Sequence, residues 1–495
     1  MVMKRRVPGI LENLLKNKEE TRYANLAYVS IVLLTILSFR LFFMQIIEGS
    51  YYKQEADGNR IRTLPIIASR GVMYDRNGIL MVGSRASYGI TMPVDRKKNS
   101  LPETELRNLA NLLKTSPAML QKKIEDNKAI FGAIYLAKDV SLDVATEIEE
   151  KKNDYPDIEV EVQPVRVYPF GNAGAQMLGY VGEAGPEDVD KNGRPYASST
   201  LIGRAGLEWQ YNQYLEGTNG SKVIEVNAAG QPVNYTGGAA ISGNNIRLTV
   251  DSALQRAAEN AVEAQVNILH GMGIFPTGAS VVAVDPNSGA ILAMVSWPSF
   301  DPNQFSRGIS SEEWDKIINN KNHPLQNRNI SSMYPPGSTF KVITGATALE
   351  AKMVTPEEKI FDNGRHWLID KRNSEGEAFG WVDFYDAMAK SDNVYFYEMG
   401  RRVGIDRLAA MSRDFGLGQL TGIDLTGEVE GNVASEEYKK KIFGQDWYLG
   451  ETFDAAIGQS FTLTTPLQMA MVYSALANGG FKYQPYLVSR VDHLD

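Results

Sequence analysis

The chain has 495 residues, of which 43% are hydrophobic and 22% are charged, and its net charge is −8. This composition excludes a disordered chain and a protein with many membrane spans. The acidic balance argues against nucleic acid as a partner, because it provides no broad basic surface. The chain has no cysteine, which excludes disulfides and thiolate sites, and its four histidines lack the spacing of metal ligands. We therefore expect neither a metal nor another cofactor.

Residues 24–47 form one apolar stretch after a basic segment. As a helix the stretch is about 36 Å long, and the hydrocarbon core of a bilayer is about 30 Å thick. The C-terminal end of the stretch (42–47) has bulky residues, whereas a signal-peptide cleavage site has small ones. We therefore expect a transmembrane anchor that is retained. Its single charged residue, Arg40, is expected to reach the membrane interface. The basic excess of residues 1–23 places this tail in the cytoplasm and the bulk of the chain outside. A buried core helix with a basic tail is the alternative.

Residues 48–245 are rich in glycine, proline and hairpin signals. The clearest signal is residues 71–82, in which two apolar runs flank Asn77-Gly78, a pair that predicts a type I′ turn. Residues 103–114 predict a helix. These patterns favour an elongated β-containing domain.

Longer helices mixed with strands characterise residues 246–495. Asp251 is expected to cap a helix. The apolar stripe of this helix is predicted to comprise Leu254, Ala257, Ala258, Ala261, Val262 and Val266. Residues 279–296 predict a hairpin around a turn at 285–289, and Thr465–Gln468 has a capping-box pattern that opens a further helix. The predicted fold class is α+β.

Ser338 and Lys341 form the most informative chemical pattern. The prolines and glycine of 335–337 end the preceding structure, so Ser338 is expected in the first turn of a helix with Lys341 one turn later on the same face. A serine hydroxyl needs a base, and a lysine can serve when burial lowers its pKa. The helix N-terminus adds backbone N–H groups that can stabilise an oxyanion.

Ser391 and Asn393 form a second pattern, Ser-x-Asn, in an apolar setting. The Ser391 hydroxyl could relay a proton between the lysine and a leaving group. The Asn393 amide could donate a hydrogen bond to a substrate carbonyl. The four candidate site residues are therefore Ser338, Lys341, Ser391 and Asn393.

Together, the two patterns resemble the first two signatures of penicillin-binding proteins and serine β-lactamases. Other segments are similar to class B (monofunctional) penicillin-binding proteins, in particular to the elongation-type group, penicillin-binding protein 2. In the first half these segments are Asn59–Arg62, Arg70–Gly78, Arg166–Pro169, Gly179–Gly182 and Gly206–Gly217. In the second half they are Asn327–Arg328, Tyr334–Lys341, Trp447–Thr452 and Ala456–Gln459.

The resemblance implies a non-catalytic pedestal (dimerisation-type) domain over residues 48–245 and a transpeptidase domain over 246–495. It implies that Ser338 attacks the D-alanyl-D-alanine carbonyl of a peptidoglycan stem peptide, that an amino group from a neighbouring strand completes the cross-link, and that β-lactams acylate the same serine. The implied partners are a SEDS-type membrane glycosyltransferase and other elongation-complex membrane proteins.

Two features depart from the family pattern. No Lys-Thr-Gly or Lys-Ser-Gly follows the Gly-Gln segment before Asp495, and Ser460 stands where glycine usually completes Gly-Gln-Gly. Without the strand that carries the third signature, the hairpin at 279–296 is expected to lack partners on one face and one edge. We expect an interrupted reading frame of an active enzyme. A catalytically inactive scaffold that regulates a glycosyltransferase is the alternative.

Overall fold

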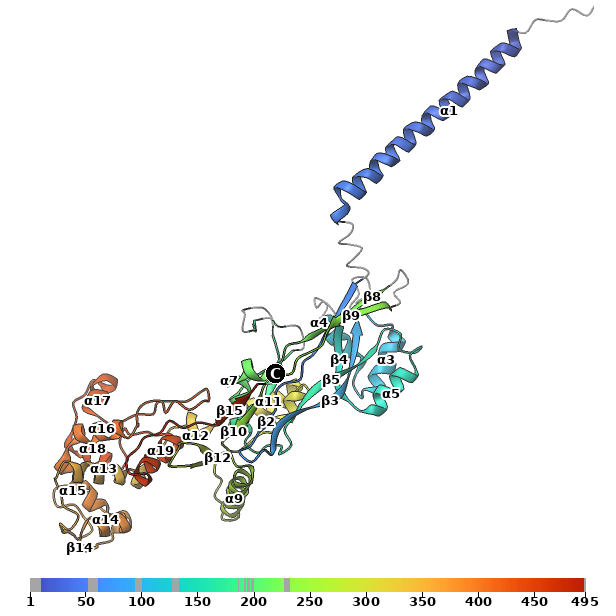
Figure 1. Ribbon diagram of the computed structural model, residues 1–495. Coiled ribbons are helices and arrows are strands. Elements are labelled where there is room, and N and C mark those ends of the chain that lie inside the picture. Colours follow the sequence, from blue (N-terminus) through green and yellow to red (C-terminus); the bar gives the residue numbers. More distant parts are fainter. Residues whose placement is uncertain are drawn as a thin grey trace, which may run out of the picture. The chain divides into compact units, whose positions relative to one another are not determined.

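The computed structural model describes residues 10–51, 61–93, 100–126, 133–185, 187–190, 193, 196, 200–226 and 232–493 (Figure 1). Asn59 and Arg60, named above for the family resemblance, lie outside these residues. The chain divides into two units. The first comprises residues 1–66 and 221–239, and the second comprises residues 67–220 and 240–495.

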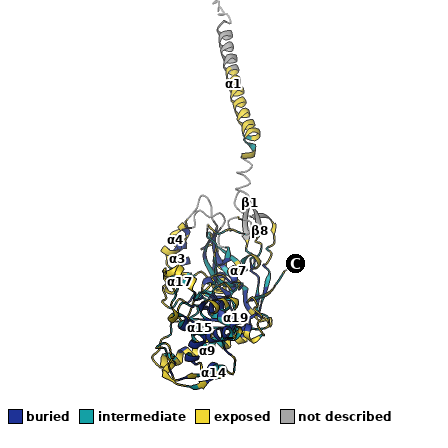
Figure 2. Ribbon diagram, turned by 90° about the vertical axis from the view of Figure 1, so that its left-hand side faces the viewer, coloured by how far each residue is buried: buried dark blue, intermediate teal, exposed yellow. Residues whose placement is uncertain are grey.

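The first unit contains the N-terminal helix and a small sheet. Helix α1 (Ile10–Phe42) continues into a π-helical turn, η1 (Phe43–Ile47). Of the described helices, only this one has a segment, Asn25–Ile47, long and apolar enough to cross a membrane. Its described side chains are almost all exposed (Figure 2), as expected of an anchor helix. The sheet has the strand order β1 (Ile61–Ile66), β8 (Gly220–Val226) and β9 (Pro232–Gly238).

The second unit begins with the pedestal sheet, in which the strands follow the order β15-β10-β2-β3-β4 and β5 also pairs with β3. Helices α3, α4 and α5 pack against β3–β5 around their own core, which includes Leu109, Ile124 and Ile148 (Figure 1). The strands are β2 (Met73–Tyr74), β3 (Leu80–Pro93), β4 (Ala133–Val140), β5 (Glu159–Val167), β10 (Asn245–Leu248) and β15 (Val488–Asp492). The helices are α3 (Glu103–Leu112), α4 (Pro117–Asp126) and α5 (Leu142–Glu150).

The hairpin predicted at residues 71–82 is present, but its turn differs from the prediction. Strands β2 and β3 pair with Met73 opposite Val82, and Gly78 has φ +86°. A type I′ turn also needs a positive φ at Asn77, which the structure does not have. The physical reason is Asp75, whose Oδ1 accepts hydrogen bonds from the backbone N–H of Asn77 and Ile79 at 2.8 Å each. This Asx-type arrangement favours a longer loop with glycine at its end.

A buried ionic cluster connects several segments of the pedestal. Glu208, which is fully buried, accepts hydrogen bonds from Arg70 at 2.7 Å and from Arg166 at 2.6 Å. Burial works against ionisation, but the two guanidiniums hold the pKa of Glu208 below its usual value. The surrounding elements are α6 (Ala175–Leu178), β6 (Val181–Glu183), β7 (Leu201–Gly203), α7 (Gly206–Gln210) and α8 (Asn212–Leu215). One hydrophobic core combines pedestal residues such as Met73 with catalytic-half residues such as Ile291.

The catalytic half combines two separate strand pairs with many helices. Its second core includes Phe340, Ile343, Tyr395, Phe396 and Phe453. The elements up to residue 350 are α9 (Ser252–Gly271), β11 (Ala279–Val284), β12 (Ile291–Trp297), α10 (Asn303–Ser306), α11 (Ser311–Ile318), α12 (Arg328–Ser331), η2 (Gly337–Phe340) and α13 (Lys341–Glu350). They are followed by β13 (Ile360–Asp362), η3 (Ser374–Gly376), β14 (Gly380–Val382), α14 (Phe384–Lys390), α15 (Asn393–Val403), α16 (Ile405–Asp414), α17 (Glu436–Phe443), α18 (Leu449–Ala456) and α19 (Pro466–Ala477). The α+β fold class is thereby confirmed.

Helix α9 has the predicted cap but not the predicted buried face. The Asp251 side chain accepts hydrogen bonds from the N–H of Ala253 and Leu254, as expected. However, the buried residues of the helix are Ser252, Gln255 and Val266, and Leu254 is 40% exposed. Of the predicted stripe only Val266 is buried, and its other five residues are exposed or half-buried. The face that packs on β12 is set instead by Gln255. Its amide donates to the carbonyl of Met294 on β12 and accepts from the Met294 N–H, at 2.9 and 2.7 Å.

The capping-box prediction at Thr465–Gln468 is confirmed, since α19 begins there with both reciprocal hydrogen bonds. The predicted hairpin at 279–296 is also present as β11–β12, and among the described strands these two pair only with each other. The chain after α19 crosses the end of this hairpin, where Tyr486 forms a bridge with Ala290. Strand β15, which the sequence did not predict, then pairs with β10 in the pedestal sheet.

Candidate active site

Ser338 lies in a tight turn that opens a helix. Gly337 has φ +57°, and the following residues form the 3-10 turn η2, which continues directly as α13. Phe340 is 1% exposed and anchors the turn in the core, while Ser338 itself is exposed. The predicted placement of Ser338 one turn before Lys341 is correct, although the first turn is 3-10 rather than α.

Gly458, from the Ala456–Gln459 segment, supports this turn from behind. The Gly337 N–H donates to the carbonyl of Gly458 at 2.9 Å. A Cβ at Gly458 would lie 2.3 Å from the Gly337 oxygen and 2.6 Å from the Phe340 Cβ, so only glycine fits. Nearby, the Thr344 hydroxyl donates to the Ala456 carbonyl at 2.7 Å. The segment therefore fixes the turn that carries Ser338.

Lys341 is the centre of the polar cluster. Its Nζ donates to the carbonyl of Ser391 at 2.6 Å, to the Ser391 hydroxyl at 3.0 Å and to Oδ1 of Asn393 at 2.6 Å. The residue is 2% exposed, and no carboxylate in the described part of the chain contacts Nζ. Burial lowers the pKa of Lys341 to about 8, although the nearby charge of Asp392 opposes this shift. With this pKa, roughly a tenth of the lysine is neutral at pH 7, far more than for an ordinary lysine.

Ser391 and Asn393 are held by the junction of two helices. Helix α14 ends at Lys390, and the following residue, Ser391, adopts a left-handed conformation with φ 55° and ψ 43°. Asp392 then caps α15 by accepting a hydrogen bond from the N–H of Tyr395 at 2.9 Å. Asn373 accepts from the backbone N–H of Asn393 at 2.8 Å and from the next N–H, that of Val394, at 3.1 Å. These contacts aim the Ser391 and Asn393 side chains at Lys341.

Asp392 is a functional candidate that sequence reasoning missed. It is fully buried, and its Oδ2 has no hydrogen-bond partner among the described residues. Burial raises the pKa of Asp392 to about 6, despite hydrogen bonds from backbone N–H groups and the charge of Lys341. The sequence offered one signal for it, since an Asp directly before Asn393 could cap the next helix. Asn373 gave no such signal.

Of the four predicted site residues, the structure brings Lys341, Ser391 and Asn393 into direct hydrogen bonding. Ser338 lies one turn from Lys341, and its hydroxyl makes no hydrogen bond within the described residues. Catalytic hydrogen bonds often tighten only once substrate is bound, so the cluster is compatible with proton transfer from Ser338. None of the described residues forms a group suited to a metal ion.

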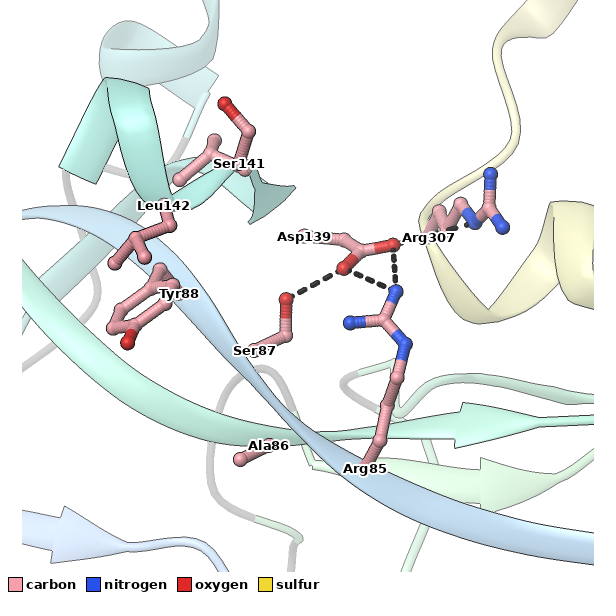
Figure 3. A pocket seen from close by; sticks show the side chains of 9 residues that line it. Arg85, Ala86, Ser87, Tyr88, Asp139, Ser141, Leu142 and Arg307 are labelled. Atoms are coloured by element: carbon pink, nitrogen blue, oxygen red, sulfur yellow. Dashed lines mark hydrogen bonds and ion pairs between the residues drawn. The ribbon is translucent and has the colours of Figure 1, made fainter.

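A second polar hollow, of about 370 Å³, lies in the pedestal (Figure 3). At its centre Asp139 accepts hydrogen bonds from Ser87 at 2.5 Å and from Arg85 at 2.6 Å, and it pairs with Arg307 at 3.3 Å. Burial opposes ionisation, but these hydrogen bonds hold the pKa of Asp139 below its usual value. The carboxylate thus joins β3, β4 and the loop after α10, and we assign it a structural role.

Comparison with known proteins agrees with this geometry. The family described as penicillin-binding protein dimerisation domain matches residues 65–248, and the penicillin-binding protein transpeptidase domain matches residues 279–493. Peptidoglycan D,D-transpeptidase MrdA of Haemophilus influenzae is 32% identical over 480 residues, which cover 94% of this chain and 71% of the relative. The Escherichia coli K12 MrdA protein is 33% identical and covers 94% and 74% of the two chains.

The chain belongs to the class B penicillin-binding proteins. Solved structures of this family agree: a chain from the complex between penicillin-binding protein 2 and MreC of Helicobacter pylori has a TM-score of 0.74 at 26% identity, covering 88% of this chain and 81% of that one. A chain from a structure described as a peptidoglycan synthase complex that coordinates polymerization and crosslinking has a TM-score of 0.69 at 31% identity, covering 95% and 80%. The resemblance stated from the motifs, to the penicillin-binding protein 2 group, is confirmed.

Proposed function

We propose that this class B penicillin-binding protein is a serine-type peptidoglycan D,D-transpeptidase in which Ser338 is the nucleophile and Lys341 is the base. The observation that carries the proposal is the state of Lys341, a buried amine one helical turn from an exposed serine, to which no carboxylate of the described residues is bonded. Its lowered pKa makes it able to accept a proton from a hydroxyl.

The first step forms an acyl-enzyme. Neutral Lys341 takes the Ser338 hydroxyl proton while Oγ attacks the D-alanyl-D-alanine carbonyl of a stem peptide. The C–N bond then breaks, and D-alanine leaves after receiving a proton through the Ser391 hydroxyl, which lies 3.0 Å from Lys341 Nζ. In the second step an amino group of a neighbouring strand attacks the ester and restores the Ser338 hydroxyl. Each step moves one proton through the same short chain of groups.

Asn393 has a different role from the proton carriers. Its Oδ1 is occupied by Lys341 at 2.6 Å, which fixes the orientation of the amide. Nδ2 is left as the donor that can hold a carbonyl of the donor peptide. One amide therefore contacts both Lys341 and the bound peptide, so it sets the position of the peptide relative to the lysine.

The proposal also specifies where the parts of the chain lie and which molecules it binds. The N-terminal tail (1–23) lies in the cytoplasm, residues 24–47 cross the membrane, and the pedestal (48–245) and transpeptidase domain (246–495) face the cell wall. Partners are peptidoglycan stem peptides, a SEDS-type glycosyltransferase and other elongation-complex membrane proteins, and β-lactams acylate Ser338. Related chains occur in complexes with MreC and in a peptidoglycan synthase complex, which supports these partners.

A fluorescent penicillin tests the nucleophile. We expect covalent label on the parent chain in membranes, none on Ser338→Ala, and unchanged label on Ser332→Ala, a nearby hydroxyl control. Thermal unfolding of each variant shows that it is folded. A folded parent chain that takes no label would contradict the proposed activity and favour the scaffold role. Label that persists on Ser338→Ala would contradict the nucleophile assignment.

A further inference from the structure

A small hairpin, residues 365–372, borders the candidate active site. Arg365 and Arg372 face each other in an antiparallel bridge, and the His366 N–H donates to the Lys371 carbonyl at 2.9 Å. The carbonyl of Arg372 lies 3.5 Å from Nδ2 of Asn393. Side chains on this hairpin therefore begin within a few ångströms of the amide that is proposed to hold the donor peptide.

Side-chain contacts hold the hairpin against the helices of the candidate site. His366, whose side chain is fully buried, lies 3.2 Å from the carboxylate of Glu398 on α15. Lys371 forms an ion pair with Asp454 on α18. Asn373, directly after the hairpin, accepts a hydrogen bond from the backbone N–H of Asn393 at 2.8 Å. Contacts to both helices leave the hairpin little freedom, so a group that it presents has a defined position.

The charges on this hairpin are not balanced. Arg365 and Arg372 are 54% and 60% exposed, and the Nε atoms of both lie 3.2–3.3 Å from the same oxygen of Asp370. The charge of Lys371 is already matched by Asp454. Like charges directly opposite each other in a strand pair are unfavourable, and one carboxylate offsets only one of the two guanidiniums. Their terminal NH1 and NH2 groups have no partner within the part of the chain that the structure describes.

We propose that Arg365 and Arg372 form a carboxylate subsite for the donor stem peptide. The inference rests on the proposed transpeptidase function and specifies its substrate. In the proposed mechanism Asn393 holds a carbonyl of the donor peptide, so the arginines beside it are placed to bind an acidic group near that carbonyl. Guanidinium forks bind carboxylates in bidentate geometry, and a free carboxylate there would relieve the repulsion between the two arginines. The preferred substrate therefore carries an acidic group at that point rather than its amide.

Competition against fluorescent penicillin tests this preference on the full chain in membranes. The competitors are a synthetic peptide ending in D-alanyl-D-alanine with one glutamate upstream of the scissile bond, and the same peptide with glutamine. The measured quantity is the ratio of their half-inhibitory concentrations within each variant, which cancels any change in labelling rate. At low salt we expect the parent to prefer the glutamate peptide by about 3- to 10-fold, as for an exposed bidentate ion pair.

Two sets of variants are expected to change this ratio in opposite directions. In Arg365→Gln/Arg372→Gln the ratio should fall to about one, whereas Asp370→Asn, which removes the competing carboxylate, should increase it. Arg107→Gln, an equally exposed arginine in the pedestal, should leave it unchanged. Equal competition by the two peptides in the parent, or an unchanged preference in the double variant, would overturn the subsite. Absence of label on the parent instead overturns the proposed function itself, so the two failures are distinguishable.

Discussion

Two clusters of buried cations in the described part of the chain differ in what surrounds the positive charge. In the pedestal, Arg70 and Arg166 are 6% and 2% exposed, and both bind Glu208, which is fully buried. In the catalytic half, Lys341 is 2% exposed, but its three hydrogen bonds go to Ser391 and Asn393, which carry no charge.

The difference separates a structural role from a chemical one. A buried carboxylate with two guanidiniums stays ionised, and the cluster joins the segments that hold it. A buried amine without a carboxylate has a lowered pKa, and it can lose and regain a proton near neutral pH. Charge compensation, rather than burial alone, therefore decides which cluster can catalyse a reaction.

Removing the lysine charge should give the largest effect and the sharpest test of this distinction. Lys341→Met keeps the volume of the side chain but removes the base. We expect the rate of Ser338 acylation by fluorescent penicillin to fall by about 10²- to 10⁴-fold, the usual size of a general-base contribution. The melting temperature should change less than in the pedestal variant below, because exposed Ser391 can bond to water. Acylation within a few-fold of the parent would contradict the base assignment.

Removing the pedestal carboxylate should act on stability instead. Glu208→Gln leaves Arg70 and Arg166 buried without a counter-charge, and breaking a buried pair in this way typically costs about 3–5 kcal/mol. Denaturant unfolding measures the loss, with Glu103→Gln, in an exposed ion pair with Arg107, as the matched control. We expect the folded fraction of Glu208→Gln to be labelled by penicillin at the parent rate. A loss below about 1 kcal/mol would mean that the cluster is not a structural centre.

The pH dependence of acylation should report the lysine directly. Because the neutral amine is the base, the rate should rise with pH, reach half its maximum near the pKa of about 8, and level off above it. Asp392 is ionised above its pKa of about 6, and its negative charge raises the pKa of Lys341. Asp392→Asn, which keeps a capping side chain, should therefore move the midpoint to lower pH. A midpoint that stays in place or moves upward would exclude this coupling.

Local sequence signals predicted much of the fold. The cap at Asp251, the capping box at Thr465–Gln468 and the hairpin at 279–296 depend on residues close in sequence, and all three are present. The features that the sequence did not predict depend on residues that are far apart in the sequence. The buried face of α9 is set by Gln255 bonding to Met294, and strand β15 forms only because β10, more than 200 residues away, pairs with it.

The candidate site shows the same limit. The patterns around Ser338 and Ser391 identified four residues, because their spacing within each helix start is local. Sequence did not reveal that Gly458 supports the turn that carries Ser338, or that Asp392 is buried near Lys341. Nor did it reveal Arg365 and Arg372, whose position depends on the contact between His366 and Glu398. Each of these requires tertiary packing that no short motif encodes.

Two serines in left-handed conformations allow a comparison in which the smallest change is expected. Ser391 has φ 55° and contributes its hydroxyl to Lys341, whereas Ser460 has φ 63° at the position where glycine usually follows Gly-Gln. A non-glycine residue in this conformation costs about 1–2 kcal/mol, and at Ser391 the cost accompanies the proposed role in proton transfer. Ser460 is exposed, and no described residue hydrogen-bonds to its hydroxyl.

Ser460→Gly should therefore stabilise the catalytic half by about 1 kcal/mol, after the added entropy of the unfolded glycine is subtracted. Denaturant unfolding measures the gain, and Ser460→Ala, which keeps the Cβ and loses only the hydroxyl, is the control that should show none. Ser391→Gly should relieve the same backbone strain but reduce penicillin acylation, because the hydroxyl beside Lys341 is lost. If Ser460→Gly and Ser460→Ala changed stability equally, the hydroxyl rather than the backbone would be responsible. The left-handed turn would then be unstrained. The Lys341 cluster would in that case differ from the Glu208 cluster of the pedestal only in how its buried charge is compensated.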